Sequence, residues 1–136
     1  MRDFKNMLCA LNLDDEANAS LVFALEFAQM FQASLHVVYV NDAMAGYRHP
    51  ADREDAIALK VKQTVPGELL DNANIVYGAA RGDTAEEIVQ YARMHQIDLI
   101  IVGHRHRGKL YSSLLDSTDV NIVDAADIPV LVVPEK

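Results

Sequence analysis

Apolar and polar residues alternate in blocks along this chain, and the blocks predict strands and helices in strict alternation. Short runs, mostly apolar, predict strands at 6–12, 34–40, 74–77, 98–102 and 128–133. Apolar residues that recur every three or four positions predict helices over 14–33, 51–64, 83–95 and 117–126. This alternation predicts an α/β fold with a parallel sheet and helices on both faces, because crossovers between parallel strands are right-handed.

The ends of two helices carry recognisable signals. Asp14 is a good N-cap for the first helix, because a short acceptor side chain can bind the free N–H groups of the first turn. Asp83 and Glu86 resemble a capping box for the helix at 83–95, with Asp in place of Ser or Thr. Pro66 and Gly67 are predicted to end the helix at 51–64.

Length and charge limit the class of protein. At 136 residues the chain is predicted to be one domain, 1–136, and its net charge of −8 argues against nucleic acid and anionic membranes as partners. No apolar run reaches the roughly 20 residues of a membrane span, and no cleavable signal is visible. The single cysteine, Cys9, lies among apolar residues, which predicts a buried, unreactive thiol in a reducing compartment. The expected location is the cytoplasm.

A basic loop follows the fourth predicted strand. Asp98–Thr118 reads DLIIVGHRHRGKLYSSLLDST, in which His104–Lys109 carries three fixed positive charges and no acidic residue. An apolar strand, a glycine, a basic loop and polar residues opening a helix can together present backbone amides to a phosphate. We therefore expect an anion site in this loop.

The same loop carries a family resemblance. Two residues separate Gly103 from His106, nine more separate His106 from Asp116, and Ser117 and Thr118 follow. Further signals are GDTAEEIV at 82–89, DLIIVG at 98–103 and PVLVV at 129–133. Over essentially its whole length the chain resembles the universal stress protein family, whose signature has this spacing with glycines at the first three positions.

The resemblance implies a fold and a site. The fold would be a Rossmann-like, adenine nucleotide alpha hydrolase-like sheet of five parallel strands in the order 3-2-1-4-5. In nucleotide-binding members, ATP lies across the carboxyl ends of strands one and four. Carried over by position, the candidate nucleotide-binding residues are Ala10, Leu11, Asn12, Val40, Val102, Gly103, Arg105, His106, Asp116, Ser117 and Thr118. The resemblance also implies a homodimer through the last strand, Ile128–Val133, whose apolar edge favours self-association.

Three candidate positions depart from the binding pattern. Asn12 stands where the family commonly has Asp, and His106 and Asp116 replace glycines. Glycine lets a phosphate approach the backbone, whereas the carboxylate of Asp116 can cap the helix and repel the anion. The chain is therefore expected to be a stress-response or regulatory binding module with weak or no ATP binding. Two alternatives stay open: a functional ATP-binding member that uses the Gly103–Thr118 loop, and a weak ATPase or autophosphorylating enzyme.

Other constellations of residues give weaker signals. His104 and His106 alternate with arginines, which oppose a metal ion, so no metal site is predicted. Ser112, Ser113 and Ser117 have no evident base and orienting acid around them, so no catalytic residue is predicted. No cofactor is certain and ATP is possible; besides the second copy, an unidentified protein is an expected partner. A response-regulator receiver is disfavoured, because no phosphoacceptor Asp closes the third predicted strand. His36 is predicted to be a satisfied core or interface residue, and His95 to end a helix.

Overall fold

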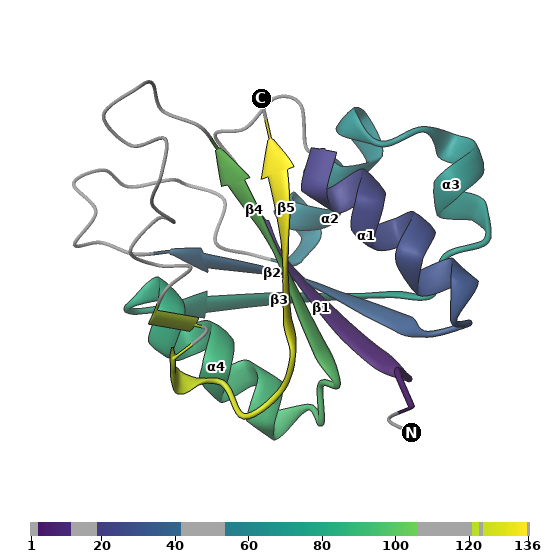
Figure 1. The fold of residues 1–136 in the computed structure, drawn as a ribbon. Coiled ribbons are helices and arrows are strands. Elements are labelled where there is room, and N and C mark those ends of the chain that lie inside the picture. The colour runs from purple at the N-terminus through teal and green to yellow at the C-terminus, as the bar shows by residue number, and fades with distance from the viewer. Residues whose placement is uncertain (1–2, 12–18, 42–53, 106–120, 123, 136) are drawn as a thin grey trace.

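Five parallel strands form one sheet in the order β3-β2-β1-β4-β5 (Figure 1). The computed structural model describes residues 3–11, 19–41, 54–105, 121–122 and 124–135. The strands are β1 (Asn6–Ala10), β2 (Ser34–Asn41), β3 (Ile75–Arg81), β4 (Leu99–Arg105) and β5 (Val130–Glu135). The predicted order is confirmed. It also differs from the 2-1-3-4-5 order of response-regulator receivers, which agrees with setting that class aside.

Helices cover both faces of the sheet. They are α1 (Ala19–Met30), α2 (Glu54–Thr64), the short α3 (Gly67–Asp71) and α4 (Thr84–Met94), and residues 121–122 and 124–125 are helical as well. Helices α1, α2 and α3 lie on one face of the sheet and α4 lies on the other (Figure 1). The first three contribute to the apolar core on their face, whereas α4 and Ile122 contribute to the other core. The prediction of helices on both faces is confirmed.

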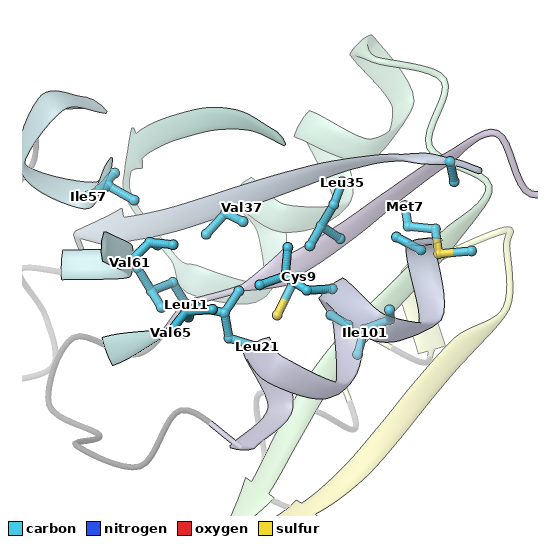
Figure 2. Packing of buried hydrophobic residues seen from close by; sticks show 14 of the residues in the cluster. Met7, Cys9, Leu11, Leu21, Leu35, Val37, Ile57, Val61, Val65 and Ile101 are labelled. Carbon is cyan, nitrogen blue, oxygen red and sulfur yellow. The ribbon is translucent and has the colours of Figure 1, made fainter. Parts of the chain in front are cut away.

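The two core clusters follow from the alternation of side chains along the strands. Met7 and Cys9 of β1 point to the face of α1, whereas Leu8 points to the face of α4. Figure 2 shows the first cluster, in which side chains of β1, β2 and β4 meet those of α1 and α2. Cys9 is fully buried, as expected for a structural thiol. Strands β1 and β4 are therefore apolar on both sides, as central strands of a parallel sheet require.

Several element bounds differ from the prediction. Strand β3 extends to Arg81 instead of ending at Tyr77, because the longer β2 pairs with it as far as Asn41. Strand β4 extends to Arg105 instead of Val102, because β5 pairs with it through Glu135. Strand β5 begins at Val130, two residues later than predicted.

Two helix ends also differ. Pro66 ends α2 as predicted, but it is also the N-cap residue of α3, a helix that the sequence did not predict. Helix α1 ends at Met30 instead of the predicted position 33. The chain turns just after it, at Gln32, whose φ is positive at 53°. The predicted N-cap of α1, Asp14, lies outside the described residues.

Candidate functional site

The order of the strands reverses between β1 and β4, and ligands of open α/β sheets bind outside the carboxyl ends of strands at such a point. The register pairs Cys9 with Ile101, so the next residues, Ala10 and Val102, lie at the same edge of the sheet, and Gly103 follows Val102 there. The Leu11 amide donates to the Val38 carbonyl at 2.8 Å, which continues the pairing of β1 with β2 by one residue. The described candidate residues of β1 and β4 therefore lie at neighbouring strand ends, and their role in binding stays a prediction.

The described candidate residues at this edge of the sheet are apolar or small. Leu11, Val40 and Val102 are buried, with exposed fractions of 7%, 8% and 3%, and their side chains belong to the two core clusters. Ala10 and Gly103 are partly exposed and small.

The basic segment begins inside a strand. His104 pairs with Pro134 and Arg105 with Glu135, so both belong to β4, and the expectation that they lie in a loop is wrong. The reason is long-range: β5 extends far enough to hold two more residues of β4 in the ladder. Gly103 consequently sits within the paired strand, opposite Val133.

The remaining candidate residues lie outside the part of the chain that the structure describes. These are Asn12, His106, Asp116, Ser117 and Thr118, together with the side chain of Arg105. Their assignment to the phosphate end of the site stays a prediction from the sequence.

The GDTAEEIV segment is a second well-defined feature at the carboxyl edge. The Gly82 amide donates to the Asn41 carbonyl at 3.2 Å. Gly82 has a φ of 136°, a backbone conformation that is strained for any residue with a side chain. Asp83 is the N-cap of α4, because its Oδ2 accepts the Glu86 amide at 3.0 Å. The predicted cap is confirmed, and the segment joins the end of β3 to the start of α4.

A group that sequence reasoning did not assemble lies on the α4 face. Nδ1 of buried His36 lies 2.7 Å from the Tyr91 hydroxyl, and the Tyr91 and His95 rings stack with centroids 4.0 Å apart. A Cβ on Gly78 would lie 2.8 Å from the Tyr91 ring. Burial lowers the pKa of His36, and the nearby His95 lowers it further.

This aromatic group is separate from the carboxyl ends of β1 and β4, and it is structural in character. The expectations that His36 is a satisfied core residue and that His95 ends a helix are both confirmed. The available sequence signal was the spacing of Tyr91 and His95, four residues apart on one helix face.

The sequence model of the universal stress protein family matches residues 3–134. The chain belongs to this family. A curated member, named universal stress protein in QAH/OAS sulfhydrylase 3'region, from Thermus aquaticus, is 29% identical over 137 residues, which cover 96% of this chain and 98% of that protein.

Solved structures of universal stress proteins share the fold of this chain. The universal stress protein UspA from Lactobacillus plantarum is 27% identical with a TM-score of 0.74, over 98% of this chain and 99% of that chain. A universal stress protein solved in complex with cAMP is 16% identical with a TM-score of 0.72, over 98% of each chain. At that identity the second likeness shows the shared fold.

The described residues offer neither a metal site nor a membrane-spanning helix. No group of three or more His, Cys, Asp or Glu side chains that could hold a metal ion occurs among them. Likewise, within the ranges that the structure describes, no helix is long and apolar enough to cross a membrane.

Proposed function

We propose that this protein is a regulatory binding module of the stress response whose nucleotide site binds ATP weakly or not at all. The observation that carries the proposal is the residue at one signature position: Asp116 stands where nucleotide-binding members of the family have glycine. The small residues Ala10 and Gly103 at the carboxyl ends of β1 and β4 support a site for the base and ribose there. The proposal is that the phosphate end of the site is impaired.

Charge supports this proposal. A phosphate about 4 Å from a carboxylate is repelled by about 4 kcal/mol per unit charge at an effective dielectric near 20. Arg105, Arg107 and Lys109 oppose the repulsion, but an exposed ion pair contributes only about 0–1 kcal/mol. His106 adds a side chain at a second position where glycine permits close approach.

Adenine nucleotides are the ligand class to test. The neighbour solved in complex with cAMP shares the fold of this chain, and cAMP carries one phosphate charge where ATP carries several. A site with an intact base end and an impaired triphosphate end discriminates between ligands by charge. We expect adenosine and cAMP to bind at least as well as ATP.

Calorimetric titration tests the proposal directly. ATP, cAMP and adenosine are titrated into the unmodified protein and into a variant with His106→Gly and Asp116→Gly. We expect ATP affinity to rise at least tenfold in the variant, with little change for adenosine. Asp71→Gly is the matched control, because it removes the same charge from an exposed residue at the end of α3.

Two results would contradict the proposal. Micromolar ATP affinity in the unmodified protein, or ATP retained through purification, would show a functional ATP site. Phosphate release from ATP by the unmodified protein, absent from the double variant, would favour an enzyme.

We also infer that the protein forms a homodimer through the free edge of β5. This strand ends the sheet, and its residues 130–133 are apolar and partly exposed. The Ile100 amide donates to the Pro129 carbonyl, so the backbone groups of every second residue from Pro129 onward point toward β4. The backbone groups of Val130, Val132 and Pro134 therefore point toward the free edge. An unpaired apolar edge of this kind tends to find a partner strand.

The β5 pairing has its own test. Val132→Pro removes an N–H from the free edge without removing one from the β4 ladder, and Pro134 shows that the ring is tolerated on this side. Light scattering after size exclusion is expected to show a dimer for the unmodified protein and a monomer for the variant. A monomeric unmodified protein at micromolar concentration would overturn the inference.

A further inference from the structure

Helix α1 carries a row of aromatic side chains on its surface. Phe23, Phe27 and Phe31 are spaced four residues apart, and Phe4 contacts the end of the row. Phe27 stacks on Phe31 with centroids 5.1 Å apart, and the centroid of Phe23 lies 5.7 Å from that of Phe27. We call Phe4, Phe23, Phe27 and Phe31 the aromatic ridge. Phe23 and Phe31 are 40% and 46% exposed.

Because of the ridge, the solvent-exposed side of α1 is apolar as well as the side that packs on the sheet. The inner face of α1, which includes Leu21 and Leu25, packs on the sheet, yet Glu26 is the only charged residue between positions 19 and 31. Met30, beside the ridge, is 81% exposed. By contrast, α4 presents Glu86, Gln90 and Arg93 to solvent. A helix that is apolar around most of its circumference is normally covered on more than one side.

The position of the ridge relates it to the edge of the sheet. Gln29 Nε2 donates to the Leu69 carbonyl of α3 at 2.8 Å, which fixes the flank of α1 that faces α3. Phe27 lies about 200° around the helix from Gln29, on the opposite flank. Helix α1 packs against β4 and β5 (Figure 1). Phe27 and Leu131 of β5 pack against the same core cluster. Phe27, in the middle of the ridge, therefore faces the side of the molecule on which β5 ends the sheet, whereas Phe31 contacts Phe4 just before β1.

We propose that the aromatic ridge is buried against a second copy of this chain. The inference rests on the proposed β5 pairing for its geometry. Two antiparallel β5 strands, related by a two-fold axis perpendicular to the sheet, would lie about 4.8 Å apart. Such an axis keeps both α1 helices on the same face, so the ridge of one copy faces the ridge of its partner, as an isologous interface requires.

The area needed by a stable dimer favours this occupant. A standard interface covers about 800 Å² per partner, whereas a six-residue edge strand offers a narrow strip roughly 20 Å long. The exposed parts of Phe23, Phe31 and Met30 add roughly 300 Å² of apolar surface beside that strip. A lipid surface is a poor occupant, because the chain has a net charge of −8 and no Lys or Arg between positions 19 and 31.

Analytical ultracentrifugation over a concentration series tests the proposal. Phe23→Gln with Phe31→Gln is expected to raise the dimer dissociation constant at least tenfold, as is Met30→Lys alone. The control for the second variant is Met94→Lys on α4, whose parent side chain is 68% exposed, and it is expected to leave the constant unchanged. Met30→Lys also guards against a folding defect in the double variant, because Met30 has little packing to lose.

The outcomes separate the ridge from the β5 edge. A dimer weakened by Val132→Pro but not by either ridge variant overturns the ridge and leaves the β5 pairing standing. A dimer weakened by the ridge variants and not by Val132→Pro overturns the β5 pairing and, with it, the two-fold arrangement proposed for the ridge. A monomeric unmodified protein overturns both. Equal weakening by Met30→Lys and Met94→Lys would show a general charge effect and overturn the ridge.

Discussion

The Tyr91 hydroxyl of α4 lies 2.7 Å from Nδ1 of His36 in β2. The contact passes across β3, where the absence of a side chain on Gly78 makes room for the Tyr91 ring. The contact thereby ties α4 to β2 across the edge strand β3. The stability of this face of the sheet should depend on these three residues together.

Tyr91→Phe removes the hydroxyl and leaves His36 Nδ1 buried without this partner. We expect the free energy of unfolding to fall by about 1–3 kcal/mol, the cost of an unsatisfied buried polar group. Urea unfolding followed by circular dichroism measures the loss. If the variant is as stable as the parent protein, the hydrogen bond contributes nothing to the fold.

The His36 group also predicts a pH dependence. Burial and the nearby His95 lower the pKa of His36 below its ordinary value of 6.5, so between the folded and unfolded values the unfolded chain binds more protons. This contribution to stability is complete above pH 6.5 and is lost as the pH falls from there through the lowered pKa. Each unit of pKa difference corresponds to about 1.4 kcal/mol.

Urea unfolding between pH 5 and pH 7.5 tests the His36 contribution against a His36→Gln variant. The parent protein is expected to lose more stability on acidification than the variant does. A His95→Gln variant should fall between the two, because it removes the smaller cause of the shift and keeps the burial. Parallel curves for all three proteins would contradict the prediction.

Gly78→Ala should be destabilising for a steric reason. The added Cβ would lie 2.8 Å from the Tyr91 ring, which stacking on His95 and the bond to His36 hold in place. We expect a loss of about 1–3 kcal/mol, typical of overpacking in a core. Gly67→Ala is the control, since nothing lies within 4 Å of its added Cβ, and we expect a change within about 0.5 kcal/mol. Equal effects of the two changes would rule out the steric explanation.

Asp98 joins the starts of two adjacent strands. Its Oδ2 accepts the backbone amides of Lys5 and Asn6, each at 2.9 Å. Asp98→Ala is expected to cost about 1–3 kcal/mol, and Asp98→Asn less, because the amide oxygen can still accept. Asp127→Ala, which removes an exposed carboxylate 3.8 Å from Arg93, should cost under about 1 kcal/mol. Thermal unfolding of the three variants ranks these costs, and a different order would refute the assigned role.

Much of the fold could be predicted because its signals are local. Apolar runs located the five strands, and Asp83 marked the start of α4. The errors come from long-range pairing: the residues at 78–81 have weak strand propensity, yet β2 holds them in the sheet. Pro66 both ends α2 and precedes α3, and the sequence pattern predicted only the first of these roles.

Less of the candidate site than of the fold could be predicted from the sequence. The strand order follows from the family resemblance, and it brings Ala10 and Gly103 to one edge although they are far apart in the sequence. Sequence spacing could not show that Arg105 belongs to β4, because that depends on the length of β5. The contact between His36 and Tyr91 links residues 55 positions apart, and no local pattern specifies it.

The central position of β1 has a consequence for biosynthesis. β1 can pair with β2 soon after both are made, but its other edge waits for β4, and the contact of Asn6 with Asp98 spans 92 residues. A ribosome adds about 5–20 residues per second, so the growing chain carries an open apolar strand edge for several seconds. A chaperone that shields strand edges should therefore raise the yield of native protein most when it acts before β4 emerges.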